Sequence, residues 1–69
     1  MTLPSPSKQA QKRALLHLRL VRDHFPTMTP EQMRDRAEVD MYYEGYDPIV
    51  AEQAVARMWR EHFETQPPI

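Results

Sequence analysis

The sequence has no cysteine, a single glycine and no long apolar run, and each of these absences excludes a class of protein. Without cysteine, neither a disulfide nor a cysteine-based zinc site can form. One glycine is too few for a glycine-rich loop that binds phosphate. No run of apolar residues approaches the roughly 18 that a membrane helix needs, and Met1–Pro6 lacks the apolar core of a signal peptide. We therefore expect a cytoplasmic protein without a cofactor.

The chain has 69 residues, and we assign them to a single domain, 1–69, with short disordered ends at 1–4 and 65–69. A domain of this size buries only about 60 % of the surface of its unfolded chain, so it is marginally stable alone. Association with another chain is one of the few remedies left when disulfides are absent. We therefore expect a homodimer or a complex with a partner protein.

Charge is unevenly placed along the chain although the net charge is only −1. Residues 1–25 hold five cations against Asp23 alone, a balance of +4, and residues 26–69 hold four arginines against nine acids, a balance of −5. Such asymmetry is typical of self-complementary packing or of binding to an acidic partner. Solvated helix faces of mixed sign are an equally good interpretation.

Three start signals predict helices at about 6–25, 30–44 and 48–64. Each signal pairs a residue that accepts a hydrogen bond with a proline at the first helical position, and the pairs are Ser5–Pro6, Thr29–Pro30 and Asp47–Pro48. Gln32 completes a capping box with Thr29. Pro26 ends the first helix, and Gly45 suits the left-handed residue after the second. The predicted fold class is all-α, either a helical hairpin or a small three-helix bundle.

Apolar residues cover more than one face of the first and third helices. On the first helix, the predicted core stripe consists of Ala14, Leu18, Val21 and Phe25. Leu16 and Leu20 lie nearly opposite that stripe when successive residues are placed about 100° apart. On the third helix, Trp59 and Phe63 widen the apolar arc beyond half of the circumference. Because a one-sided helix needs no such residues, we predict a homodimer whose interface contains Leu16, Leu20, Trp59 and Phe63.

Neither a metal site nor a catalytic site is predicted, so we do not expect an enzyme. His17 and His24 are two helical turns apart, roughly 10 Å, which is too far for both to bind one ion. The carboxylates of the second helix lack the buried setting that separates carboxyl pKa values in active sites. They are Asp35, Glu38, Asp40 and Glu44.

A basic ridge on the first helix is the predicted partner-binding surface, and it consists of Lys12, Leu15, Arg19 and Arg22. Its cations suit an acidic protein surface, and its leucine suits an apolar centre. The adjacent Tyr42 and Tyr43, which cannot both point inward, are the second choice together with Tyr46.

DNA binding is the alternative function. Three helices with a tight turn between the last two suggest a helix-turn-helix regulator, with residues 47–63 as the recognition helix. The first turns of that helix present Asp47, Ile49 and Glu52. Acidic and apolar side chains are poorly suited to a polyanion, so we favour a protein partner over nucleic acid.

Two resemblances bear on the function. Glu44-Gly45-Tyr46 followed by Ala51 and Ala54-Val55 resembles the loop and alanine-rich second helix of ubiquitin-associated domains. The likeness is short, and no third helix, which that fold needs, is predicted after Phe63, so we interpret it as a convergent helical corner.

In length, composition and helix layout, the whole chain is similar to small phage-encoded host-takeover proteins, among them the quorum-sensing anti-activators of Pseudomonas phages. This second resemblance implies a homodimer that binds a LuxR-type transcription regulator, and also a pilus-assembly motor, and inhibits its partner. It rests on no motif, so no functional residue is carried over from it.

Overall fold

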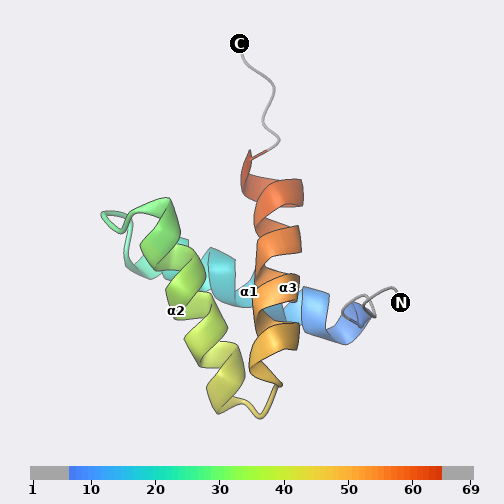
Figure 1. The fold of residues 1–69 in the computed structure, drawn as a ribbon. Coiled ribbons are helices and arrows are strands. Elements are labelled where there is room, and N and C mark those ends of the chain that lie inside the picture. Colours follow the sequence, from blue (N-terminus) through green and yellow to red (C-terminus); the bar gives the residue numbers. More distant parts are fainter. Residues whose placement is uncertain (1–6, 65–69) are drawn as a thin grey trace.

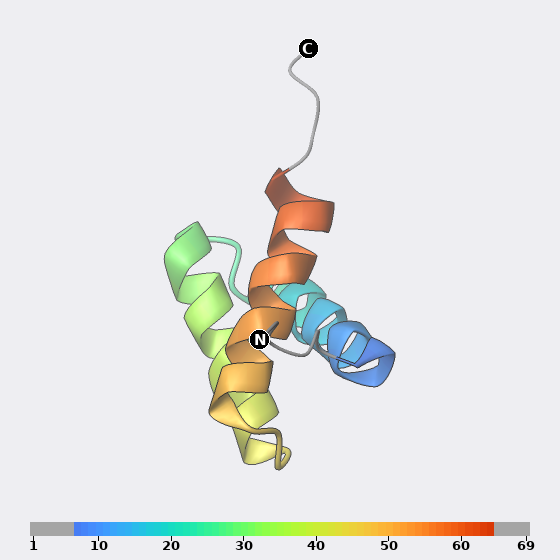
Figure 2. The same cartoon turned by 45° about the vertical axis from the view of Figure 1, so that its right-hand side comes forward.

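A computed structural model describes residues 7–64 and shows an all-α fold, as predicted. The elements are α1 (Lys8–His24), α2 (Pro30–Tyr43), α3 (Pro48–Trp59) and the π-helical turn η1 (Arg60–Glu64). The helices α2 and α3 form a V that is joined at its point, and α1 crosses steeply behind both (Figures 1 and 2). The disordered ends expected at 1–4 and 65–69 lie outside the described residues.

The first helix begins at a different serine from the predicted one. The hydroxyl oxygen of Ser7 accepts a hydrogen bond from the backbone N–H of Ala10 at 3.1 Å, which makes Ser7 the cap of α1. Ser5 and Pro6 lie outside the described residues. At the other end, Phe25 leaves the helical region with φ −132° and ψ 66°. Because proline disfavours helical backbone at the residue before it, Pro26 ends the helix where expected.

The capping box of α2 is confirmed. The backbone N–H of Gln32 donates to the hydroxyl oxygen of Thr29 at 3.2 Å, and the backbone N–H of Thr29 donates to the side-chain oxygen of Gln32 at 3.1 Å. At the start of α3, the carboxylate of Asp47 accepts from the backbone N–H of Ile49 at 2.8 Å. Both caps satisfy backbone donors that the first turn of a helix leaves without partners.

Gly45 closes α2 in the manner expected of a glycine after a helix. Its φ of +101° is a conformation that side chains with a Cβ rarely adopt. The N–H of Gly45 donates to the carbonyl of Tyr42 at 3.0 Å, and that of Tyr46 donates to the carbonyl of Met41 at 3.2 Å. This pair of bonds is a Schellman motif, and it turns the chain sharply into α3.

The core between the helices is rich in small side chains. Of the eleven buried apolar residues in the described part of the chain, five are alanines, namely Ala10, Ala14, Ala37, Ala51 and Ala54. The larger residues are Leu18, Val21, Met41, Val55, Met58 and Trp59. Small side chains let helix backbones approach closely, so the three helices pack tightly around a small volume.

One residue of the predicted core stripe, Phe25, is exposed, and so is Ala56 on the third helix. Phe25 is 43 % exposed, because the chain has already left the helix there and the helical spacing no longer places its side chain. Ala56 is exposed on the outer side of α3, because Ala54, Val55 and Met58 occupy the face that packs inward. Ala37 and Met41 are the buried residues of α2, and Met33 packs against the same core.

We predict that Thr29→Ala lowers the free energy of unfolding by about 1 kcal/mol, because the variant leaves the N–H of Gln32 without its partner. For a domain of this size, that loss corresponds to a fall in Tm of roughly 4–8 °C. Thermal unfolding followed by circular dichroism measures it. Thr27→Ala, in the exposed turn before α2, is the control and should leave Tm nearly unchanged. Equal Tm values for both variants would contradict the assigned role of Thr29.

Candidate functional site

Large apolar side chains on the surface are the main candidate for a functional site. Among the described residues, those that are exposed are Leu16, Leu20, Phe25, Val39, Tyr42, Tyr43 and Ile49. They fall into one group on α1 and the residue that follows it, and a second group on α2 and the start of α3. Side chains of this size are more often buried in a domain, so these two groups are the candidate surfaces for contact with other molecules.

The first surface is the outward face of α1, which we define as Lys12, Leu16, Arg19 and Leu20. Leu16 is 41 % exposed, and it lies one helical turn from each of the other three residues. Within residues 7–64, Lys12 and Arg19 form no ion pair with the protein. The face therefore presents two leucines beside two cations that remain available to a partner.

The predicted basic ridge is only partly present on this face. Leu15, which we placed at its exposed centre, is half-buried and packs against the core. The reason is that α1 packs against both α2 and α3, so its buried arc is wide enough to include Leu15. Arg22 is exposed, but its guanidinium lies 5.2 Å from the centre of the Phe63 ring and 3.6 Å from the carboxylate of Asp23. Leu16 is therefore the apolar centre that Leu15 was expected to be.

Trp59 and Phe63, which we predicted in a dimer interface, contact their own chain. Their rings are stacked at 4.9 Å between centres with 8° between planes, and Trp59 is only 8 % exposed. Arg34 of α2 lies 5.1 Å from the Trp59 ring, and Arg22 of α1 lies over Phe63. These cation–ring and ring–ring contacts join all three helices. Leu16 and Leu20 are exposed and Phe63 is partly exposed, whereas Trp59 is buried, so the first three are the residues of the predicted interface that a second chain could reach.

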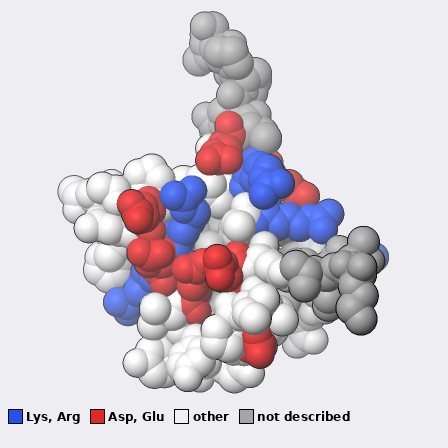
Figure 3. Space-filling view, viewed as in Figure 1, with Lys and Arg blue, Asp and Glu red and all other residues white. Residues whose placement is uncertain are grey.

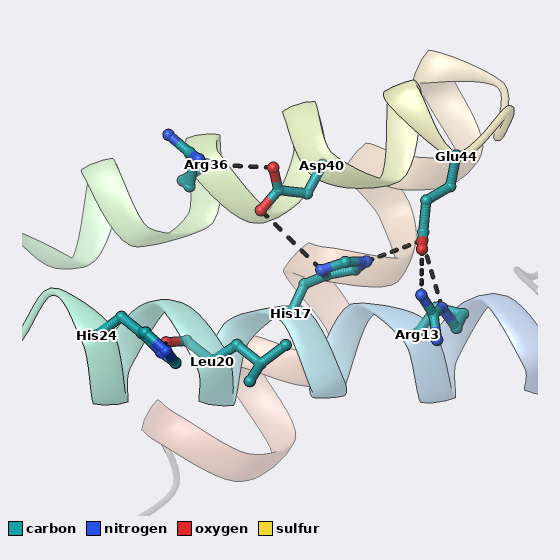
Figure 4. A network of polar contacts seen from close by, with 7 residues as sticks. All are labelled: Arg13, His17, Leu20, His24, Arg36, Asp40 and Glu44. Atoms are coloured by element: carbon teal, nitrogen blue, oxygen red, sulfur yellow. Dashed lines mark hydrogen bonds and ion pairs between the residues drawn. The ribbon is translucent and has the colours of Figure 1, made fainter.

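A polar network between α1 and the end of α2 was not predicted from the sequence (Figure 4). The carboxylate of Glu44 accepts from Arg13, and one of its oxygens lies 2.8 Å from Nε2 of His17. The other ring nitrogen of His17 lies 4.0 Å from the carboxylate of Asp40, which also pairs with Arg36. We had interpreted Glu44 and Asp40 as solvated, because nothing in the sequence links them to residues about 30 positions away.

The second surface is a groove between α2 and the first turns of α3. Its apolar wall consists of Val39, Tyr42, Pro48 and Ala51, its edges carry Glu38 and Glu52, and its volume is about 320 Å³. Beyond the two glutamates, it continues into a polar hollow that includes Glu31 and Asp35. On this face of the molecule, acidic side chains gather over α2 and the adjoining part of α3 (Figure 3). We call the whole feature the α2–α3 groove.

The position of Glu38 in this groove disfavours the ionised form of its carboxyl group. Burial raises its pKa above the ordinary value, and the neighbouring carboxylates of Asp35 and Glu52 raise it further. Arg34 acts in the opposite direction but does not cancel these effects. The ionised form of Glu38 is therefore less favourable in the folded protein than in the unfolded chain.

Other kinds of site find no support in the described part of the chain. Residues 7–64 contain no group of three or more histidine, aspartate or glutamate side chains arranged to hold a metal ion. None of the helices there is both long and apolar enough to cross a bilayer. Comparisons with protein-family models, with curated proteins and with solved structures find no match. The function therefore has to be inferred from the two surfaces themselves.

We predict that Glu44→Gln makes folding less sensitive to acid. Arg13 and then His17 lower the pKa of Glu44, so the stability that its carboxylate contributes is present above the ordinary pKa of 4.5 and is lost as pH falls through the lowered value. Tm measured from pH 7 down to about pH 3 should fall more steeply for the parent than for the variant. Glu61→Gln removes a carboxylate that pairs with Arg57 within one helical stretch, and should keep the parental profile.

Glu38→Gln is predicted to act in the opposite direction. Because the pKa of Glu38 is raised, its ionisation costs folding stability as pH rises above the ordinary value of 4.5. The amide removes that cost and has nearly the same shape, so Tm should rise at pH 7 and change less at about pH 4. A Tm at pH 7 below that of the parent would contradict the inference that ionised Glu38 destabilises the folded protein.

Proposed function

We propose that this protein is a non-enzymatic interaction module that binds a partner protein and inhibits it. The observation that carries the proposal is the outward face of α1, where exposed Leu16 and Leu20 adjoin Lys12 and Arg19. The fitting partner surface is acidic with an apolar centre. Opposite charges speed the encounter, and burial of the leucines supplies affinity, since well-packed apolar anchors contribute most of the binding free energy.

Inhibition in this proposal is steric. A compact helical module that covers the surface through which its target works needs no chemistry of its own. The resemblance to phage anti-activators supports a LuxR-type transcription regulator as the target and a pilus-assembly motor as a second one. In that form of the proposal, the module acts inside the bacterial cytoplasm.

A homodimer is the second proposed use of the same leucines. Leu16 and Leu20 are one turn apart and both are exposed, although Leu20 also borders a hollow shared with Arg36 and Asp40 of α2. Such an apolar pair is suited to self-association. A homodimer through this pair leaves Lys12 and Arg19 at its edge.

DNA binding fits the surface less well. The face on which α2 and α3 are exposed carries Asp35, Glu38 and Glu52 (Figure 3). DNA-binding proteins neutralise phosphates with cations, and these carboxylates oppose that contact. Helix-turn-helix binding would require this acidic side of the molecule to approach the polyanion.

We predict that Lys12→Glu combined with Arg19→Glu weakens binding to a purified LuxR-type regulator at least about tenfold, a loss of about 1.4 kcal/mol. Arg57→Glu is the control, because it reverses an exposed charge that lies outside both the outward face of α1 and the α2–α3 groove. Isothermal titration calorimetry measures the affinities, and a reporter gene driven by the regulator measures inhibition. If the α1 double variant and the control bound and inhibited alike, the outward face of α1 would not be the binding surface.

Leu16→Glu combined with Leu20→Glu tests the homodimer. Both residues are exposed, so the circular dichroism spectrum should stay helical. Sedimentation equilibrium should give a dimer for the parent and a lower mass for the variant at micromolar concentration. A monomer mass for the parent across that range would exclude the homodimer and leave the leucines to the partner protein alone.

A further inference from the structure

The α2–α3 groove has two properties that the proposed function does not use. One end is apolar and is lined by Val39, Tyr42, Pro48 and Ala51, so a side chain without charge can be buried there. The edges between this end and the polar hollow carry Glu38 and Glu52, which belong to both. An occupant that fills the apolar end therefore meets two carboxylates immediately beside it.

The charges that line the groove are predominantly negative. Glu31, Asp35, Glu38 and Glu52 all contribute to it, and the cations at its polar end are Arg34 and Arg60. Arg34 already lies over the Trp59 ring and 4.0 Å from the carboxylate of Glu64. Burial raises the pKa of Glu38, and the nearby carboxylates of Asp35 and Glu52 raise it further, so like charges face one another in the groove. A cation brought by an occupant would relieve the repulsion between them.

We propose that the α2–α3 groove binds a basic amphipathic helix of a partner protein. An apolar side chain of that helix occupies the end formed by Val39, Tyr42 and Ala51. Lysine or arginine side chains one turn away pair with Glu38 and Glu52. A helix is the fitting occupant because it places apolar and cationic residues at i and i+4 on adjoining parts of its surface, and the described chain offers no strand edge to an extended peptide.

This site is separate from the outward face of α1, and the two surfaces carry charges of opposite sign. The α1 face presents cations beside leucines, whereas the groove presents carboxylates beside an apolar wall. The module would then hold an acidic protein surface through α1 and a basic helix through the groove. Failure of either surface leaves the other testable.

The test uses a fluorescein-labelled synthetic helix of alanine, leucine and arginine, with leucines at i, i+4 and i+7 flanked by arginines. Its counterpart carries glutamate in place of arginine. Fluorescence anisotropy should show that the intact protein binds the arginine peptide, more weakly as salt is raised, and does not bind the glutamate peptide. Nuclear magnetic resonance shifts should fall on Val39, Ala51 and Glu52 rather than on Leu16 and Leu20.

Glu38→Gln combined with Glu52→Gln should weaken binding of the arginine peptide at least about tenfold, because it removes both carboxylates at the edge of the apolar end. Asp23→Asn combined with Glu61→Gln is the matched control, since it removes two carboxylates outside the groove, and it should retain parental affinity. Val39→Asn is a second test, and it should also weaken binding because it removes part of the apolar wall at an exposed position without adding charge.

Several results would overturn the proposal. They are no binding of the arginine peptide, equal binding of both peptides, parental affinity in both groove variants, or shifts confined to α1. A second copy as the occupant would also overturn it. In that case, sedimentation would show a dimer for the parent. The dimer would be lost both in the groove variant and in Lys12→Glu combined with Arg19→Glu. The arginine peptide would then bind only by dissociating the dimer.

Discussion

Close contact between helices through alanine is the constraint on which the rest of this structure depends. Ala10 and Ala14 of α1, Ala37 of α2, and Ala51 and Ala54 of α3 are all buried in one core cluster. Side chains this small let the helix backbones approach closely, and larger residues such as Leu18, Met41 and Val55 fill the rest of the core. Leu16, Leu20 and Tyr43 stay outside this core, where they are candidate contacts for another molecule.

The cations of the first helix have two different roles in the folded chain. Some of them pair within the protein, where Arg13 and His17 contact Glu44 at the end of α2. Because this contact lies beside the turn at Gly45, it fixes the corner from which α3 departs (Figure 4). Other charges stay on the surface, with cations on the outward face of α1 and carboxylates along the α2–α3 groove. Opposite charges are thus separated onto two faces of one small domain.

Features that depend on a few neighbouring residues could be predicted from the sequence, and features that depend on packing could not. The capping box at Thr29, the cap at Asp47 and the glycine after α2 follow from local hydrogen bonding and backbone conformation, which are set within a few residues. The choice of Leu16 rather than Leu15 as the exposed leucine depends on how wide an arc α1 buries, and that is decided by two other helices. The Arg13–Glu44 contact and the groove arise between segments far apart in the chain, for which a single sequence carries no signal.

The groove also shows why surface carboxylates in so small a domain are informative. A small domain has a low free energy of unfolding. Keeping Glu38 half-buried near Asp35 and Glu52 lowers that free energy further. Folding alone gives no reason for such a cost, and an amide at the same position would avoid it. A ligand that binds only the folded state adds stability in proportion to its affinity and concentration. A cationic partner in the groove would therefore stabilise the fold twice, by its own binding free energy and by offsetting the repulsion among the carboxylates that receive it.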